Sequence, residues 1–226
     1  MPTAITQIIF DLDGLLLNTE DLHASVIQEI AARYGKSYGP EVKAQVVGKR
    51  ALESSQALVD ALDLPLTGEA CRAERHRMMR DRYSQTQLMP GVERLTGYFQ
   101  AQGIPMAIAT SSHTENFQLK TRHHQSWLQR FRTIVKGDDA ALVRGKPAPD
   151  IFLLAAQRLG VEPQHCLVFE DSPAGVSAAR SAGMSVVAIP DPDLDLSLFQ
   201  KAHQVLPSLE EFMPEYWNFE AMIPCL

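Results

Sequence analysis

The chain has 226 residues, 45% of them hydrophobic and 21% charged, which is typical of a globular protein built as one large domain or as a domain with an insertion. The formal net charge of −6 argues against general nucleic-acid binding, and no apolar run is long enough to cross a bilayer. The three cysteines form no disulfide or metal pattern, and the N-terminal residues do not resemble a signal peptide, so we expect a cytoplasmic protein.

The first predicted element is a buried parallel strand over residues 5–10, where apolar and β-branched residues dominate. Asp11 and Asp13 follow it, and residues two apart in an extended chain face the same side. Gly14 then permits a tight turn and a close approach of the backbone to a ligand. Ligands of open parallel sheets bind at the carboxyl ends of strands, so we interpret this stretch as a candidate acidic site. For this motif alone, a solvated turn is the alternative.

The next segment contains helical patterns and no convincing strand. We expect Thr19 to cap a helix that runs to about Tyr34 and stops at Gly35. Further helices are predicted over residues 41–47, 51–62 and 69–83. The last of these carries five arginines, which we interpret as a solvated face, with substrate steering as the alternative.

Beyond Met89-Pro90-Gly91 the pattern changes to alternating strands and helices. Strands are predicted over 105–109, 133–135, 166–169 and 185–189, and helices over 92–102, from 113 to about 123, over 151–159 with Asp150 as the cap, and over 173–182. The alternation predicts an α/β fold with a Rossmann-like, doubly wound parallel sheet. We therefore predict a catalytic core of residues 1–16 and 89–226, with an all-helical cap domain of residues 17–88 inserted into it.

Polar side chains end three of these strands. They are Asp11 and Asp13, Thr110 and Ser111, and Glu170 and Asp171, and Lys146 lies in a proline-rich loop between the second and third pair. If the strands are neighbours, all of these residues converge on one place. Taken one at a time, these residues have simpler interpretations: Thr110 could be no more than a helix cap, and Lys146 could be a surface lysine.

Four motifs carry a family resemblance along nearly the whole chain. They are Asp11-Leu12-Asp13-Gly14, Ala109-Thr110-Ser111, Lys146-Pro147 and Glu170-Asp171-Ser172-Pro173-Ala174-Gly175. In this order and spacing the chain resembles the haloacid dehalogenase superfamily, in the branch with a helical C1-type cap inserted after the first motif.

The resemblance implies phosphoryl transfer through an aspartyl-phosphate. Asp11 would be the nucleophile, and Asp13 would protonate the leaving oxygen and then deprotonate water. A carboxylate that attacks a phosphate dianion meets repulsion of roughly 4 kcal/mol per charge pair at about 4 Å, which a bridging Mg²⁺ would remove. The resemblance assigns Mg²⁺ to Asp11, the carbonyl of Asp13 and Asp171, with Glu170 either a ligand or an orienting group. It assigns the phosphoryl oxygens to Thr110, the amide of Ser111 and Lys146.

One departure from the family pattern lies at the expected hinge, where Asn18 stands in place of the usual aspartate. The missing charge is expected to affect closure of the cap more than the nucleophile or metal site. Substrate specificity is assigned to the cap, with His23, Lys49 and Arg50 as candidate residues, and to the loop at Ser112-His113. For His23, a role as a partly buried spacer is the alternative.

Longer phrases such as Gly137-Asp138-Asp139 narrow the resemblance to the pseudouridine-5'-phosphatases and the plant glycerol-3-phosphate phosphatases. We therefore expect a monomeric Mg²⁺-dependent phosphatase of a small phosphomonoester, a sugar, nucleoside or glycerol phosphate, with no nucleic-acid or membrane partner. A phosphosugar mutase resembling β-phosphoglucomutase is the alternative, although Ala51 stands where such mutases carry an arginine. A binding module that retains only the fold is the third interpretation.

Overall fold

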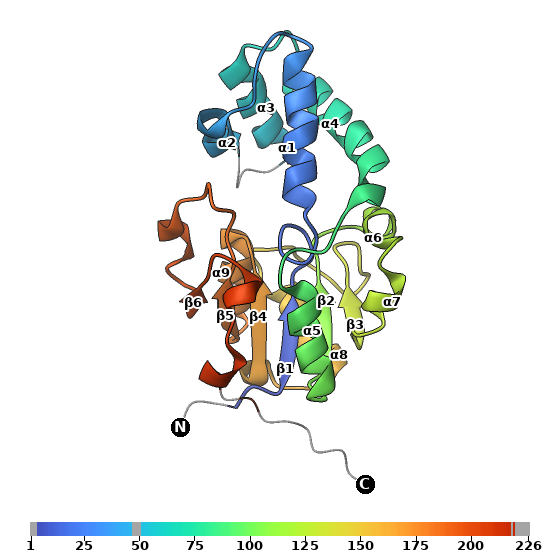
Figure 1. Cartoon of the computed structure of the whole chain (residues 1–226), viewed down its shortest axis with the longest axis vertical. Helices are drawn as coiled ribbons and strands as arrows, with labels where there is room; N and C mark the ends of the chain where they lie inside the picture. The colour runs from blue at the N-terminus through green and yellow to red at the C-terminus, as the bar shows by residue number, and fades with distance from the viewer. Residues whose placement is uncertain (1–3, 47–50, 218, 220–226) are drawn as a thin grey trace.

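A six-stranded parallel sheet forms the centre of the protein, in a computed structural model that describes residues 4–46, 51–217 and 219 (Figure 1). Its strands are β1 (Gln7–Phe10), β2 (Met106–Ala109), β3 (Thr133–Val135), β4 (Cys166–Glu170), β5 (Ser185–Ala188) and β6 (Gln204–Val205). Their spatial order is β3-β2-β1-β4-β5-β6, and all neighbouring pairs are parallel. The predicted parallel α/β fold is confirmed, with β6 as an additional strand that the sequence pattern did not predict.

The strand order puts β1 at the point where the direction of winding reverses. The chain passes from β1 to β2 and β3 on one side, then crosses to β4, β5 and β6 on the other. The carboxyl end of a strand at such a reversal is the usual ligand site of an open α/β sheet. Asp11 follows β1 directly and is therefore at this position.

Helices cover both faces of the sheet, and the side chains of β1 alternate between them. Ile8 and Phe10 belong to one apolar cluster with the helices α5 (Val92–Ala101), α6 (Thr114–Thr121) and α7 (Gln125–Leu128). Ile9 belongs to the other, with α8 (Asp150–Leu159) and α9 (Pro173–Ser181). Burial on both faces explains why Ile8, Ile9 and Phe10 of β1 form a continuous apolar run.

Four helices form a separate group beyond the carboxyl ends of the strands, drawn at the top of Figure 1. They are α1 (Thr19–Ala32), α2 (Pro40–Val46), α3 (Ala51–Leu62) and α4 (Gly68–Arg82), followed by the short 3₁₀ turn Tyr83–Gln85. Their buried apolar residues, which include Val26, Leu58 and Met79, make a cluster distinct from the two clusters of the sheet. We call these helices the cap. No helix among the described residues combines the length and apolar character needed to cross a membrane.

The two chain segments that join cap and sheet lie side by side. Leu17 and Leu88 pair as an antiparallel bridge, and the N–H of Asn18 donates to the carbonyl of Gln87 at 3.1 Å. The side-chain oxygen of Asn18 accepts from the N–H of Gln87 at 2.8 Å. An amide oxygen therefore makes the contact that a carboxylate at this position would make, and the missing charge leaves the joint intact.

Two expected helix caps are wrong. Thr19 is the first residue of α1, and Asn18 occupies the cap position; the N–H of Thr19 donates to the carbonyl of Leu17 at 2.8 Å. Its hydroxyl is buried without a partner among the described residues. Asp150 is likewise the first residue of α8, and its carboxylate accepts from Arg144 instead of from the helix. The helix expected to continue to about residue 123 ends at Thr121, and α7 begins at Gln125.

Candidate active site

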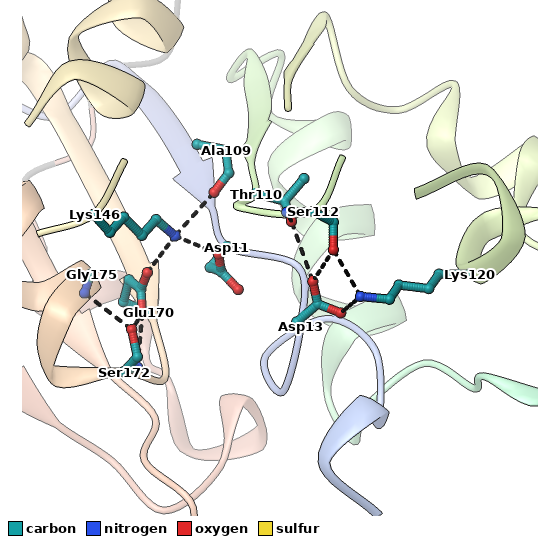
Figure 2. Close-up of polar contacts among 10 residues, drawn as sticks. All are labelled: Asp11, Asp13, Ala109, Thr110, Ser112, Lys120, Lys146, Glu170, Ser172 and Gly175. Carbon is teal, nitrogen blue, oxygen red and sulfur yellow. Dashed lines mark hydrogen bonds and ion pairs between the residues drawn. The ribbon is translucent and has the colours of Figure 1, made fainter. Parts of the chain in front are cut away.

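Lys146 joins residues from three strand ends into one buried group (Figure 2). Its Nζ donates to Asp11 Oδ1 at 2.5 Å, to Glu170 Oε1 at 2.6 Å and to the carbonyl of Ala109 at 3.2 Å. Asp11 follows β1, Glu170 ends β4 and Ala109 ends β2, which are adjacent strands. The side chain of Asp11 is 8% exposed and that of Glu170 is fully buried, so one ammonium is shared by two carboxylates away from water.

Asp13 belongs to a second group, on the other side of the loop that follows β1 (Figure 2). Its Oδ2 accepts from Ser112 Oγ at 2.7 Å and from Thr110 Oγ1 at 3.3 Å, and its Oδ1 accepts from Lys120 Nζ at 2.5 Å. The two aspartates of the first motif therefore contact different cations, Lys146 and Lys120. They can consequently hold different protonation states.

Lys120 is a site residue that the sequence analysis missed. It is 4% exposed, it donates to Ser112 Oγ at 2.8 Å, and its Nζ lies 4.6 Å from the centre of the Tyr83 ring. The available signal was its place on α6, three residues after buried Phe117 and next to buried Thr121. A lysine on the apolar face of a helix requires a charge partner, because an unpaired buried charge is costly.

Two glycines allow the carboxylates to approach the backbone. A Cβ on Gly14 would lie 2.3 Å from Asp171 Oδ2, and Gly14 also has a φ of +79° that side chains rarely adopt. A Cβ on Gly175 would lie 1.6 Å from Glu170 Oε1. Both positions must therefore be glycine if the two acids are to keep their places.

The environment shifts the pKa values of Asp11 and Asp13 in opposite directions. Burial raises the pKa of Asp11 to about 7, and Glu170 and Asp13 add to the rise although Lys146 opposes it. Burial also opposes ionisation of Asp13, but Lys120 and the hydrogen bond from Ser112 outweigh it and lower the pKa of Asp13. Burial, Glu170 and Asp11 together raise the pKa of Asp171 well above its ordinary value.

The acids Asp11, Glu170 and Asp171 form a possible metal site. Each offers an oxygen atom, and these atoms lie within 4.8 Å of one another. Lys146 is the one cation that pairs with this trio among the described residues, so a negative charge remains, and a divalent cation would compensate it. An all-oxygen donor set suits Mg²⁺. Glu170 Oε2 already accepts from the amide and hydroxyl of Ser172, which leaves Asp11 and Asp171 as the freer ligands.

The other residues predicted for the site have different surroundings. Thr110 is fully buried and also accepts from the amide of Ser112 at 3.0 Å, whereas Ser111 is exposed at the end of β2. His23 lies on α1 and borders two cavities in the cap. Burial, followed by Lys120 and Arg75, lowers the pKa of His23 to about 4. Lys49 and Arg50 lie outside the described residues.

Comparison with known proteins identifies the family that the chain resembles. Residues 5–183 match the family model for haloacid dehalogenase-like hydrolases. The chain is 44% identical to a probable pseudouridine-5'-phosphatase of Drosophila melanogaster, over 96% of this chain and 95% of the relative. It is 42% identical to (DL)-glycerol-3-phosphatase 2 of Arabidopsis thaliana, over 95% and 92%. A second Arabidopsis glycerol-3-phosphatase, named mitochondrial, is 43% identical over 95% of this chain and 74% of the relative.

Two solved structures show similar folds. A HAD family hydrolase from Deinococcus radiodurans with bound phosphate and sodium has a TM-score of 0.78 at 26% identity, over 94% of this chain and 95% of that one. A putative β-phosphoglucomutase from Thermotoga maritima has a TM-score of 0.73 at 30% identity, over 92% and 96%.

Proposed function

The chain belongs to the haloacid dehalogenase-like hydrolase family and is a phosphatase of that family, and on this premise we propose that it hydrolyses a small phosphomonoester by Mg²⁺-dependent phosphoryl transfer to Asp11. The observation that carries the proposal is the separation of Asp11 and Asp13. They are two residues apart, yet one contacts Lys146 and the acidic trio, and the other contacts Lys120 and Ser112. Two carboxylates with separate partners suit two chemical roles. Without metal the pKa of Asp11 is raised and that of Asp13 is lowered, so the proposed roles require that bound Mg²⁺ favour the ionised form of Asp11 and that the bound phosphate dianion favour the protonated form of Asp13.

In the first step, a carboxylate oxygen of Asp11 attacks phosphorus and the ester P–O bond breaks. Asp13 gives a proton to the departing alkoxide oxygen, which leaves as an alcohol. In the second step water attacks the phosphorus of the aspartyl-phosphate while Asp13 takes its proton, and the acyl P–O bond breaks to release phosphate. Asp11 is regenerated as a carboxylate.

Other residues of the site would hold the phosphoryl group and the metal. Lys146, the hydroxyl of Thr110 and the amide of Ser111 would donate to the phosphoryl oxygens and stabilise the charge in transfer. Asp11, Asp171 and the carbonyl of Asp13 would bind Mg²⁺, with Glu170 as a further ligand or as the group that orients Lys146. When bound, Mg²⁺ would offset the repulsion between the carboxylate and the phosphate dianion.

We further propose that residues 17–88 act as a cap domain that closes over this site, and that residues 1–16 and 89–226 form the catalytic core. The antiparallel bridge between Leu17 and Leu88 supports this division, because both connections meet at one place. Closure would exclude water during transfer to Asp11 and opening would readmit it. We expect the protein to act as a monomer; a cytoplasmic location stays a prediction.

The natural substrate belongs to the class of small phosphorylated metabolites. Relatives named as glycerol-3-phosphatases and as pseudouridine-5'-phosphatase are about equally similar to this chain, and therefore support a glycerol, sugar or nucleoside phosphate without choosing one. Mutase activity is the second candidate, because a structural neighbour is a putative β-phosphoglucomutase.

The test is hydrolysis of p-nitrophenyl phosphate with Mg²⁺ by the wild-type protein and by Asp11→Asn. We expect turnover by the wild type, loss of turnover in the variant, and an unchanged circular dichroism spectrum. Turnover near the wild-type rate in the folded variant would remove Asp11 from the nucleophile role, and an inactive wild type would support the binding-module interpretation. A screen of phosphorylated metabolites then identifies the substrate. A requirement for a bisphosphate activator would indicate a mutase instead.

A further inference from the structure

Arg75 differs from the three arginines that follow it on α4, the helix for which a solvated face is expected. Arg77, Arg80 and Arg82 each pair with a glutamate. Arg75 forms no ion pair with any described residue, and its Nη1 donates only to the hydroxyls of Ser55 at 3.0 Å and Ser54 at 3.3 Å. A guanidinium has five N–H donors and stays charged in proteins, so Arg75 retains both charge and donors for another group.

The cavity that Arg75 borders is lined by cap residues, and two of these residues also approach the core. It has a volume of about 270 Å³ and is lined by residues that include Glu20, His23, Tyr38, Lys43, Ser54 and Arg75. Glu20, in the lining of the cavity, lies next to the catalytic loop, because its Cγ would be 3.3 Å from a Cβ on Gly14. Lys43, also in the lining, contacts the core: its Nζ lies 2.9 Å from Oδ1 of Asp191, which is just beyond β5. A molecule bound at Asp11 could therefore extend into this cavity.

Among the described residues that line the cavity, Glu20 is an acid that attracts Arg75 from a distance, but no carboxylate forms an ion pair with it. Lys43 is neutralised by Asp191 and Asp193. His23 is neutral near pH 7, because burial lowers its pKa to about 4. A second cavity, of about 220 Å³, also has Arg75 and His23 in its lining, so Arg75 borders both cavities. Partly buried donors that lack protein partners are stabilised when a ligand supplies acceptor oxygens.

We propose that this cavity binds the end of the substrate that is not phosphorylated, and that Arg75 selects substrates whose far end carries a strong acceptor, either a carboxylate or a ring carbonyl, over those that carry only hydroxyls. The inference rests on the phosphatase function proposed above and adds a substrate class to it. The cavity volume of about 270 Å³ leaves room for such an end.

The experiment compares kcat/KM of the wild type and of Arg75→Met on four substrates. Phosphoglycerate carries a carboxylate, uridine 5'-monophosphate carries ring carbonyls, glycerol 3-phosphate carries only hydroxyls, and p-nitrophenyl phosphate reports the chemical step. We expect Arg75→Met to lower kcat/KM by about 10- to 100-fold on whichever acceptor-bearing substrate the wild type hydrolyses, the effect of losing a charged hydrogen bond. Glycerol 3-phosphate and p-nitrophenyl phosphate should change by less than about threefold.

Arg77→Met is the matched control, because Arg77 lies on the same helix and its side chain is 69% exposed. It should leave all four values unchanged. Parallel losses on every substrate in Arg75→Met would overturn the proposal, and so would a wild type that hydrolyses glycerol 3-phosphate but neither acceptor-bearing substrate. A wild type inactive even on p-nitrophenyl phosphate would instead refute the proposed function itself. The two acceptor-bearing substrates separate a carboxylate from a carbonyl as the group that Arg75 binds.

Discussion

Replacing the proposed nucleophile should stabilise the metal-free protein at neutral and higher pH. Burial raises the pKa of Asp11 from its ordinary 3.8 to about 7. Between about pH 4 and pH 7 the folded state therefore binds a proton at Asp11 that the unfolded state has released, and the contribution of Asp11 to stability falls as the pH rises through this range. At about 1.4 kcal/mol per pKa unit, the whole change is about 4 kcal/mol. Asp11→Asn does not titrate and escapes this loss.

The measurement is the midpoint of thermal unfolding of wild type and Asp11→Asn in EDTA, at several values between about pH 4 and pH 8. For a chain of this size about 4 kcal/mol corresponds to roughly 8–16 °C, so the advantage of the variant should grow by that amount across the range. The lowered pKa of His23 acts with the opposite sign between about pH 4 and 6.5. Because His23 is present in both proteins, its effect cancels in the difference. A difference that does not change with pH would refute the reasoning, and so would one that favours the wild type as the pH rises.

Four further predictions concern the chemistry. Asp13→Asn should lose more activity on alkyl phosphates than on p-nitrophenyl phosphate, because a good leaving group needs less protonation; equal losses would argue against general acid catalysis. EDTA should stop turnover, Mg²⁺ should restore it, and Ca²⁺ should do so poorly because it prefers more ligands and longer bonds. Asp171→Ala should raise the Mg²⁺ concentration for half-maximal rate, and an unchanged requirement would show that Asp171 is not a ligand. Lys120→Met should lower kcat by about tenfold or more because Asp13 loses its charged partner, whereas the exposed control Arg122→Met should not; similar rates in both would show that Lys120 does not position Asp13.

The sequence predicts features that depend on local pattern better than those that depend on distant partners. The strand at 133–135 and the helix at 51–62 were predicted with their observed bounds, because a run of apolar residues and a helical period are local signals. The strand β6 has only two residues and no pattern, and its place follows from pairing with β5. The prediction that Thr19 caps the first cap helix was wrong, because the turn at Leu17 binds the N–H of Thr19 and the helix begins at Thr19 itself.

The same distinction holds within the site. The four motifs placed Asp11, Asp13, Thr110 and Glu170 at the ends of adjacent strands and Lys146 in a loop beside them, where the structure also has them. Lys120 contacts Asp13, which is 107 residues away in the sequence, and the residues next to Lys120 in the sequence do not indicate this partner. Arg75 lies among arginines that do face glutamates, so composition alone could not distinguish it.

The paired joint between cap and core has a consequence for how such proteins can be rebuilt. Because Asn18 and Gln87 are hydrogen-bonded neighbours, the distance between the two cut ends is that of a single strand pair. An insertion whose two ends lie side by side requires little change in the backbone of the domain into which it is inserted. The segment between them could therefore be exchanged for another helical unit, or replaced by a tight hairpin turn, while β1 and its neighbours keep their register. Such chimaeras would put the same phosphate chemistry under a different lid.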